Sequence, residues 1–286
     1  MVVELQRRLI GMFDSGVGGL TVARAVIDIL PHEDLVYFGD SARCPYGPRP
    51  ADEVRRFAFE IMDSLMEEDV KLLVIACNSA ASTALEEARS RYDVPIISVI
   101  EPGTKAAVAA TRNRRIGLIG TEATVSSGAY DRAVTDTKAN VTLFSEACPR
   151  FVEFVEQGDT TSDELLKIAE EYLQPLKDQD VDTLLLACTH YPLLTGVIQY
   201  VMGEGVLLIS SAEVTAIEVY ARLKGDDLLN PSHELGTHRF IASSEEGISS
   251  DLGTRFLGPE FRDVETRPWG SDHREWQPDH EKQTPA

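Results

Sequence analysis

Two cysteines end two similar apolar segments, and a matched pair of thiols can transfer protons. Residues 70–77 read VKLLVIAC and residues 181–188 read VDTLLLAC, so Val, Leu, Ala and Cys recur at the same four positions. Such segments are typical of strands buried on both faces of a parallel sheet. Because ligands of open α/β sheets bind beyond the carboxyl ends of the strands, Cys77 and Cys188 stand where reacting thiols would lie.

A matched pair of thiols suits a reaction that inverts a carbon centre. One group removes a proton from one face of the carbon, and the other delivers a proton to the opposite face. One cysteine must start as a thiolate and the other as a thiol, because only the thiolate is a base. A helix predicted over 80–91 follows Cys77, and its N-terminal dipole and free amides are expected to lower the pKa of that thiol.

Small polar residues near the same strand ends are candidates for holding a substrate. Hydroxyl and amide groups that could bind its carboxylates and ammonium are those of Ser15, Asn78, Ser79, Thr121 and Thr189. Asp14 and His190 are predicted to assist proton transfer, although a helix cap and a core histidine are alternative interpretations. The glycine-rich segment 14–19 lacks the G-x-G-x-x-G spacing, which disfavours a dinucleotide site. The loop 39–50 is rich in Pro and Gly, and it either contacts substrate through Tyr46 and backbone amides or is a structural turn.

A second repeat predicts the architecture. Residues 10–15 (IGMFDS) resemble residues 116–121 (IGLIGT), and this pair is separated by nearly the same interval as the two cysteines. The interval is too long for a solenoid and indicates a duplicated unit. We therefore expect an α/β fold with two pseudo-symmetric domains, each a mostly parallel sheet flanked by helices, and an active site in the cleft between them.

The order of apolar segments suggests where the domains divide. The first domain is predicted to contain residues 1–100 and 210–266, and the second residues 101–209. Residues 267–286 are polar and without periodicity, so a disordered tail is expected. Helices are predicted over 20–30, 51–69, 80–91, 104–111, 164–176, 193–202, 211–223 and 248–256, with a further helix opened by Cys148-Pro149.

Composition excludes several classes of protein. The chain has 286 residues, 43% of them apolar, which is a globular composition. No apolar run reaches the roughly 18 residues of a membrane span, and no signal peptide is recognisable, so a cytoplasmic protein is expected. The net charge of −20 argues against direct nucleic-acid binding, which needs clustered Lys and Arg. The four cysteines contain no C-x-x-C pair, so neither a zinc ribbon nor a thioredoxin-type motif is expected.

Four motifs in order resemble the glutamate racemase family. They are Asp14-Ser15-Gly16-Val17-Gly18-Gly19, Pro45-Tyr46-Gly47, Cys77-Asn78-Ser79-Ala80 and Cys188-Thr189-His190-Tyr191-Pro192. The resemblance covers roughly residues 9–223 and continues more loosely to about 258. It implies an isomerase that makes D-glutamate for peptidoglycan, and hence for cell wall biogenesis and cell shape, without any cofactor or metal. It also implies a cytoplasmic homodimer.

The resemblance also implies roles for individual residues. Cys77 and Cys188 become the two acid/base residues. The substrate-contacting pairs become Asp14 and Ser15, Tyr46 and Gly47, Asn78 and Ser79, and Thr189 and His190, with Thr121 in the contact loop of the second domain. A supporting glutamate is expected after Ala147-Cys148-Pro149, where Glu156 fits best and Glu153 is the competitor. The family usually has Thr at Ser79 and Gly at Ala187, but neither departure removes a reacting group.

Three alternatives to a glutamate racemase stay open. The first is an aspartate or related amino-acid racemase of the same two-cysteine superfamily. The second is a non-catalytic binding protein on the same fold, since some family members are reported to inhibit DNA gyrase. The third is a thiol hydrolase with Cys77 as nucleophile, which leaves the second cysteine without a role.

Overall fold

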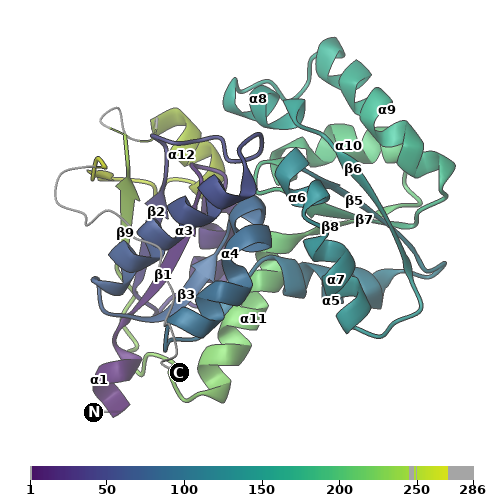
Figure 1. Ribbon diagram of the computed structural model, residues 1–286. Coiled ribbons are helices and arrows are strands. Elements are labelled where there is room, and N and C mark those ends of the chain that lie inside the picture. Colours follow the sequence, from purple (N-terminus) through teal and green to yellow (C-terminus); the bar gives the residue numbers. More distant parts are fainter. Residues whose placement is uncertain (1, 245–247, 249, 270–286) are drawn as a thin grey trace, which may run out of the picture.

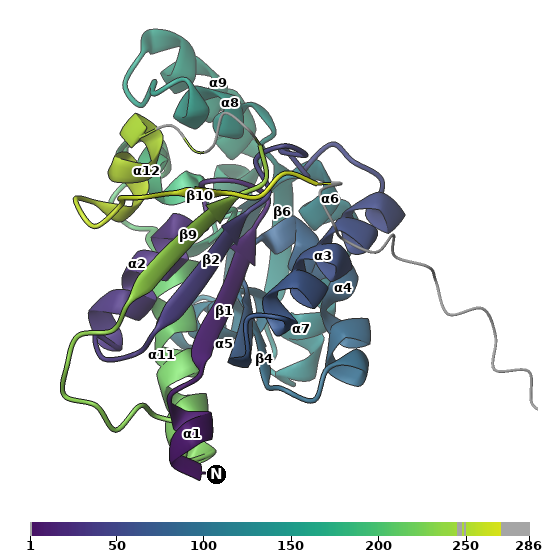
Figure 2. The same ribbon diagram turned by 90° about the vertical axis from the view of Figure 1, so that its left-hand side faces the viewer.

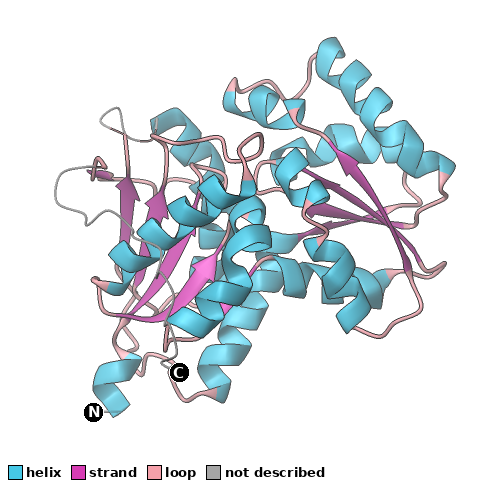
Figure 3. Ribbon diagram, in the orientation of Figure 1, coloured by secondary structure: helices cyan, strands magenta, loops and turns pink. Residues whose placement is uncertain are grey.

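Two parallel sheets lie side by side in the computed structural model, which describes residues 2–244, 248 and 250–269 (Figure 1). We call the larger sheet with its helices the first half, and the smaller sheet with its helices the second half. Within the described residues, neighbouring strands of both sheets are all parallel, as Figure 3 shows by the common direction of the arrows. The predicted fold class is therefore confirmed.

The larger sheet has the order β10-β9-β2-β1-β3-β4. Its strands are β1 (Leu9–Asp14), β2 (Leu35–Gly39), β3 (Val70–Ile75), β4 (Ile96–Ser98), β9 (His238–Ala242) and β10 (Glu265–Thr266). Every residue of β2 and β3 is buried, as expected for strands covered by helices on both faces. Val70 and Leu72–Ile75 supply the apolar and β-branched side chains that such covered strands require.

Helices cover both faces of the larger sheet (Figure 2). They are α2 (Leu20–Ile29), α3 (Ala51–Met66), α4 (Asn78–Arg91), α11 (Ser211–Gly225) and α12 (Ser250–Leu257), and α1 (Val2–Gln6) precedes β1. α3 and α4 pack together on one face, while α2 lies on the other and contacts α11 and α12. Crossover helices of this kind connect parallel strands in one sheet.

The smaller sheet has the order β6-β5-β7-β8. Its strands are β5 (Arg115–Gly120), β6 (Thr142–Ala147), β7 (Thr183–Ala187) and β8 (Leu207–Ser210). Its helices are α5 (Ile100–Ala110), α6 (Glu122–Ser126), α7 (Ala129–Asp136), α8 (Arg150–Glu156), α9 (Asp163–Asp178) and α10 (Thr195–Met202), with the 3₁₀ helix η1 at Tyr191–Leu194. The division into a first domain of residues 1–100 and 210–266 and a second of residues 101–209 stays a prediction.

Several elements differ from the sequence prediction. α5 begins at Ile100 rather than at Thr104, because proline is tolerated in the first turn of a helix and Pro102 lies there. α4 begins at Asn78, immediately after Cys77, rather than at Ala80. No element is predicted from the sequence at α1, α6, α7 or β10. No helix within the described ranges is both long and apolar enough to cross a membrane.

The predicted disordered tail, 267–286, begins too early. Trp269 lies against the first half, where its indole nitrogen donates to Asp40 at 2.7 Å and its ring lies 3.8 Å from the Arg43 guanidinium. Aromatic packing and a cation–π contact therefore extend the ordered chain beyond β10. Residues 270–286, where the rest of that prediction falls, lie outside the described residues.

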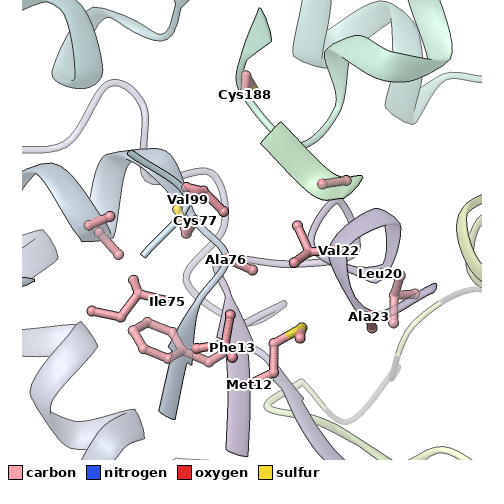
Figure 4. Close-up of a cluster of buried hydrophobic side chains, with 14 of the residues drawn as sticks. Met12, Phe13, Leu20, Val22, Ala23, Ile75, Ala76, Cys77, Val99 and Cys188 are labelled. Carbon is pink, nitrogen blue, oxygen red and sulfur yellow. The ribbon is translucent and has the colours of Figure 1, made fainter. Parts of the chain in front are cut away.

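Cys77, one of the two thiols, lies directly beyond a strand of the hydrophobic core of the first half. Figure 4 shows Phe13 and Ile75 on one side of the sheet and Met12 on the other, with Cys77 beyond the end of β3 and Cys188 on the chain of the second half. All three apolar side chains are completely buried. A thiol carried on such a closely packed strand end has little freedom to move.

Candidate active site

A cavity of about 160 Å³ lies where strand ends of the two halves meet. Nearly every residue predicted for the site lines it: Ser15, Tyr46, Gly47, Cys77, Asn78, Ser79, Thr121, Glu156, Cys188, Thr189 and His190. Both cysteines are thus exposed to one shared space, with 5% and 6% of their surfaces accessible. Asp14, also predicted, is completely buried and lies behind the wall of the cavity rather than in it.

Cys77 stands at the junction of β3 and α4. Its backbone is extended, and its carbonyl accepts the amide of Ala81 at 2.8 Å, so the chain turns from strand to helix at this residue. Burial, with a smaller contribution from the negative charge of Asp14, raises the pKa of Cys77 to about 12. Hydrogen bonds from Ala80 and Ser15 act in the opposite direction. The amide at the helix N-terminus lowers this pKa as expected, but desolvation outweighs it, so the net shift of the pKa is upward.

Asp14 joins the two halves behind the cavity. Its carboxylate accepts the amide of Gly16 at 3.1 Å and the hydroxyl of Thr189 at 3.4 Å. The turn after β1 comes so close to this part of the second half that a Cβ on Gly18 would lie 2.3 Å from the Thr189 hydroxyl and 2.6 Å from the His190 ring. Only glycine fits there, which explains one glycine of the first motif.

His190 lies between the second thiol and a carboxylate. Its Nδ1 is 3.9 Å from the sulfur of Cys188, and its Nε2 is 3.4 Å from Glu156 Oε1. Burial alone would lower its pKa, but the interactions with Cys188 and Glu156 raise the pKa of His190 to about 10. The ring is therefore an imidazolium at neutral pH. A positive charge beside a cysteine sulfur favours its thiolate form.

Glu156 is better placed than Glu153 for a supporting role. The carboxylate of Glu156 forms an ion pair with His190, and this interaction lowers the pKa of the carboxyl group against the effect of burial. It also accepts the thiol of Cys44 at 3.7 Å. Glu153 lines the cavity as well, but it is 63% exposed and lies 4.0 Å from Arg150. The geometry favours the first of the two predicted candidates.

Hydroxyl groups connect the halves along one side of the cavity. Ser79 and Thr121 lie within hydrogen-bonding distance at 2.9 Å, and Thr121 contacts Thr124 at 3.1 Å. Nearby, the carbonyl of Gly47 accepts the amide of Ala123 at 3.1 Å. Ser79 thus makes a hydroxyl contact across the two halves.

Tyr46 lines the cavity, and its predicted contact with substrate stays a prediction. Its hydroxyl donates to Asp40, a completely buried carboxylate, so this group is already bonded to the protein. Asp40 also accepts the hydroxyl of Ser243 at 2.7 Å and the indole of Trp269 at 2.7 Å. Only the remaining surface of Tyr46 is available to the cavity, and its hydroxyl holds the loop in place.

The sequence analysis missed several residues of this site. Cys44, Pro149 and Val152 line the cavity although no chemical pattern marks them, and Cys44 was interpreted as a loop residue. The one available signal was its position directly before the Pro45-Tyr46-Gly47 motif.

The charged side chains of the cavity wall are three carboxylates, Glu122, Glu153 and Glu156, and the imidazolium of His190, and the other lining groups are neutral. Among the described residues that line it there is neither Lys nor Arg. Carboxylates of a ligand would therefore be bound by hydroxyls, amides and the N-terminus of α4, assisted by His190. No cluster of three or more His, Cys, Asp or Glu side chains suited to a metal ion occurs in the described part of the chain.

Comparison with known proteins identifies the family. The family model for Asp/Glu/hydantoin racemases matches residues 20–219, which is more than half of the chain. The chain belongs to this family. It is accordingly an isomerase, and the two thiols facing one cavity are the feature that a racemase needs.

Individual racemases agree with this assignment. The glutamate racemase of Parafrankia sp. (strain EAN1pec) is 55% identical over 260 residues, which is 91% of this chain and 94% of the relative. The crystal structure of glutamate racemase isoform RacE1 from Bacillus anthracis matches with a TM-score of 0.86 at 39% identity, covering 92% and 97% of the two chains. That of glutamate racemase from Thermus thermophilus in complex with β-chloro-D-alanine matches with a TM-score of 0.83 at 42% identity, covering 92% and 98%.

Proposed function

We propose that this racemase interconverts L- and D-glutamate by proton transfer at Cα between Cys77 and Cys188. The observation that carries the proposal is the pair of thiols that come from corresponding strand ends of two halves and line one cavity. The glutamate racemases at 39% to 55% identity support glutamate as the substrate.

The reaction needs one thiolate and one thiol at the start. The thiolate removes the α-proton from one face of the substrate and becomes a thiol, leaving the electron pair on Cα. The opposite thiol then gives its proton to the other face of Cα and becomes the thiolate. Hydroxyl and amide dipoles of the cavity stabilise the charge that develops meanwhile. The reverse reaction uses the same two groups in exchanged roles.

His190 and Asp14 are proposed to influence which of the two cysteines carries the proton before the reaction. The imidazolium of His190 favours a negative charge on Cys188, and Glu156 keeps the ring protonated and oriented. The charge of Asp14 and burial favour the protonated form of Cys77. Ser15, Asn78, Ser79, Thr121 and Thr189 are proposed to hold the substrate, with the surface of Tyr46 and Gly47 closing one side.

Exchange in D₂O tests the proposal directly. Purified protein without added cofactor is incubated with L-glutamate, and optical rotation and deuterium at Cα are followed together. Loss of rotation with deuterium entering the product is the expected result. A parallel incubation with L-aspartate is the matched control, and a faster reaction of aspartate would replace glutamate as the proposed substrate.

Further properties are proposed from the family resemblance. They are a cytoplasmic location, a role in supplying D-glutamate for peptidoglycan, and a homodimer, whose mass light scattering at micromolar concentration would measure. A monomer mass would contradict the dimer. Inhibition of DNA gyrase also stays a prediction, and a supercoiling assay that shows no inhibition at high excess of protein would remove it.

A further inference from the structure

A buried hydrogen bond connects the two halves beside the cavity. The hydroxyl of Tyr130, in α7 of the second half, donates to Oδ1 of Asn78 at 2.5 Å. Asn78 is the first residue of α4 in the first half and directly follows Cys77. Gly128 adopts a left-handed conformation with φ of 65°, which lets the chain turn from α6 into α7 and bring Tyr130 to this position.

The other end of the same amide has no protein partner. Nδ2 of Asn78 is buried and lacks a hydrogen bond within the described residues, although the side chain lines the cavity and is only 3% exposed. A buried amide donor without a partner costs about 1–3 kcal/mol. Because groups of this kind in folded proteins nearly always have a partner, a ligand in the cavity is the natural acceptor.

We propose that Tyr130 is a positioning residue, which fixes the amide of Asn78 so that its NH₂ group faces the cavity as the donor to a substrate carboxylate. The proposal rests on the proposed function, because that function supplies the carboxylate. It assigns a role to a residue outside the motifs of the sequence analysis, in a helix which that analysis did not predict.

The hydroxyl of Tyr130 selects one of the two amide orientations. In the observed orientation the phenol proton is donated to Oδ1. After a flip, Nδ2 would donate to the phenol oxygen, and the phenol proton would lose the acceptor that it now has. The flip would also direct Oδ1, which can only accept, toward the carboxylate of the substrate. Both changes oppose substrate binding.

Tyr130 is suited to act as a permanent donor. The residue is 2% exposed, and burial together with the negative charge of Cys188 raises its pKa above the ordinary range of a phenol. The hydroxyl thus keeps its proton throughout the pH range in which the enzyme would work. Since Tyr130 and Asn78 belong to different halves, the donor is oriented only when the two halves are in contact.

Tyr130→Phe tests the role with the ring left in place. We expect KM for L-glutamate to rise about tenfold, which corresponds to the loss of about 1.4 kcal/mol of binding, with a smaller change in kcat. Tyr92→Phe is the matched control, because it removes a hydroxyl that donates to Asp63 at 2.6 Å in the first half. That variant should keep the wild-type KM. An unchanged KM in Tyr130→Phe would overturn the proposal.

A double-mutant cycle separates positioning from a general structural effect. Asn78→Ala is expected to raise KM at least as much as Tyr130→Phe, and adding Tyr130→Phe to it should change KM less than about twofold. A further tenfold rise in the double variant would show that Tyr130 acts by another route and would overturn the proposal. Racemisation by the wild type is measured first, so a failure of the proposed function itself is seen before any variant is compared.

Discussion

The two thiols occupy corresponding strand ends, yet their surroundings have opposite charge. Cys77 has the carboxylate of Asp14 behind it, and its pKa is raised to about 12. Cys188 has the imidazolium of His190 at 3.9 Å. The exposed fractions of the two sulfur-bearing residues are nearly equal, so charge rather than access distinguishes them. A duplicated fold thus supplies two like thiols, and one charged neighbour in each half makes their surroundings unlike: a carboxylate behind Cys77 and an imidazolium beside Cys188.

The largest effect on activity is expected when one of the two thiols is removed. Cys77→Ala and Cys188→Ala should each lower racemisation by at least about 10³-fold, because each removes the proton carrier of one face. Cys148→Ala is the matched control, since Cys148 is buried but does not line the cavity. Near-normal turnover in either of the first two variants would refute the two-base assignment.

Alkylation should reveal the asymmetry without substrate. At pH 7.5 iodoacetamide is expected to label Cys188 about tenfold faster than Cys77, because the thiolate is the nucleophile and His190 favours it at Cys188. His190→Asn should abolish most of this preference and lower turnover by about 10²-fold. Peptide mass spectrometry measures the labelled fraction of each cysteine. Equal labelling in the wild type would contradict the unequal resting states.

Glu156→Gln should have a smaller effect than the loss of His190. The neutral amide can still contact the ring but supports the imidazolium less, so a roughly tenfold fall in kcat is expected. Glu153→Gln serves as the matched control, because its exposed carboxylate forms an ion pair with Arg150 and not with His190 among the described residues. If the two variants lose activity equally, Glu156 is not the supporting glutamate.

The smallest expected effect is on stability at high pH. The pKa of His190 is about 10 in the folded protein and about 6.5 in an unfolded chain, so its protonation contributes stability that is complete below about pH 6.5 and is lost as the pH rises through about 10. Between pH 6 and pH 10, the Tm of the wild type should therefore fall more than that of His190→Asn. Equal falls would show that the ring is not protonated in the folded state.

The sequence predicts the reacting groups better than their electrostatics. Strand ends bearing Cys77 and Cys188 are recognisable because apolar, β-branched segments stop abruptly at polar residues. The net upward shift of the pKa of Cys77 was not predicted, since burial and a carboxylate distant in sequence decide it. These are properties of packing, which a local pattern of residues does not contain.

The same limit explains the elements that were missed. α7 has only eight residues. Ala129, Tyr130, Ala133 and Val134 recur at helical spacing, but the segment is shorter than the stretch over which such a pattern identifies a helix. Its contribution to the site, Tyr130, meets Asn78 across 52 positions of sequence. Trp269 similarly reaches Asp40 across 229 positions. Contacts between distant segments cannot be derived from either segment alone.

The path of the chain through the two sheets also bears on how a ribosome would produce this protein. All four strands of the smaller sheet, β5 to β8, lie between residues 115 and 210. The edge of β2 in the larger sheet is covered only by β9, which begins at residue 238. An uncovered edge strand is a template for aggregation. We therefore expect the sheet of the second half to form first during synthesis. The first half should remain prone to aggregation until β9 and β10 have been synthesised.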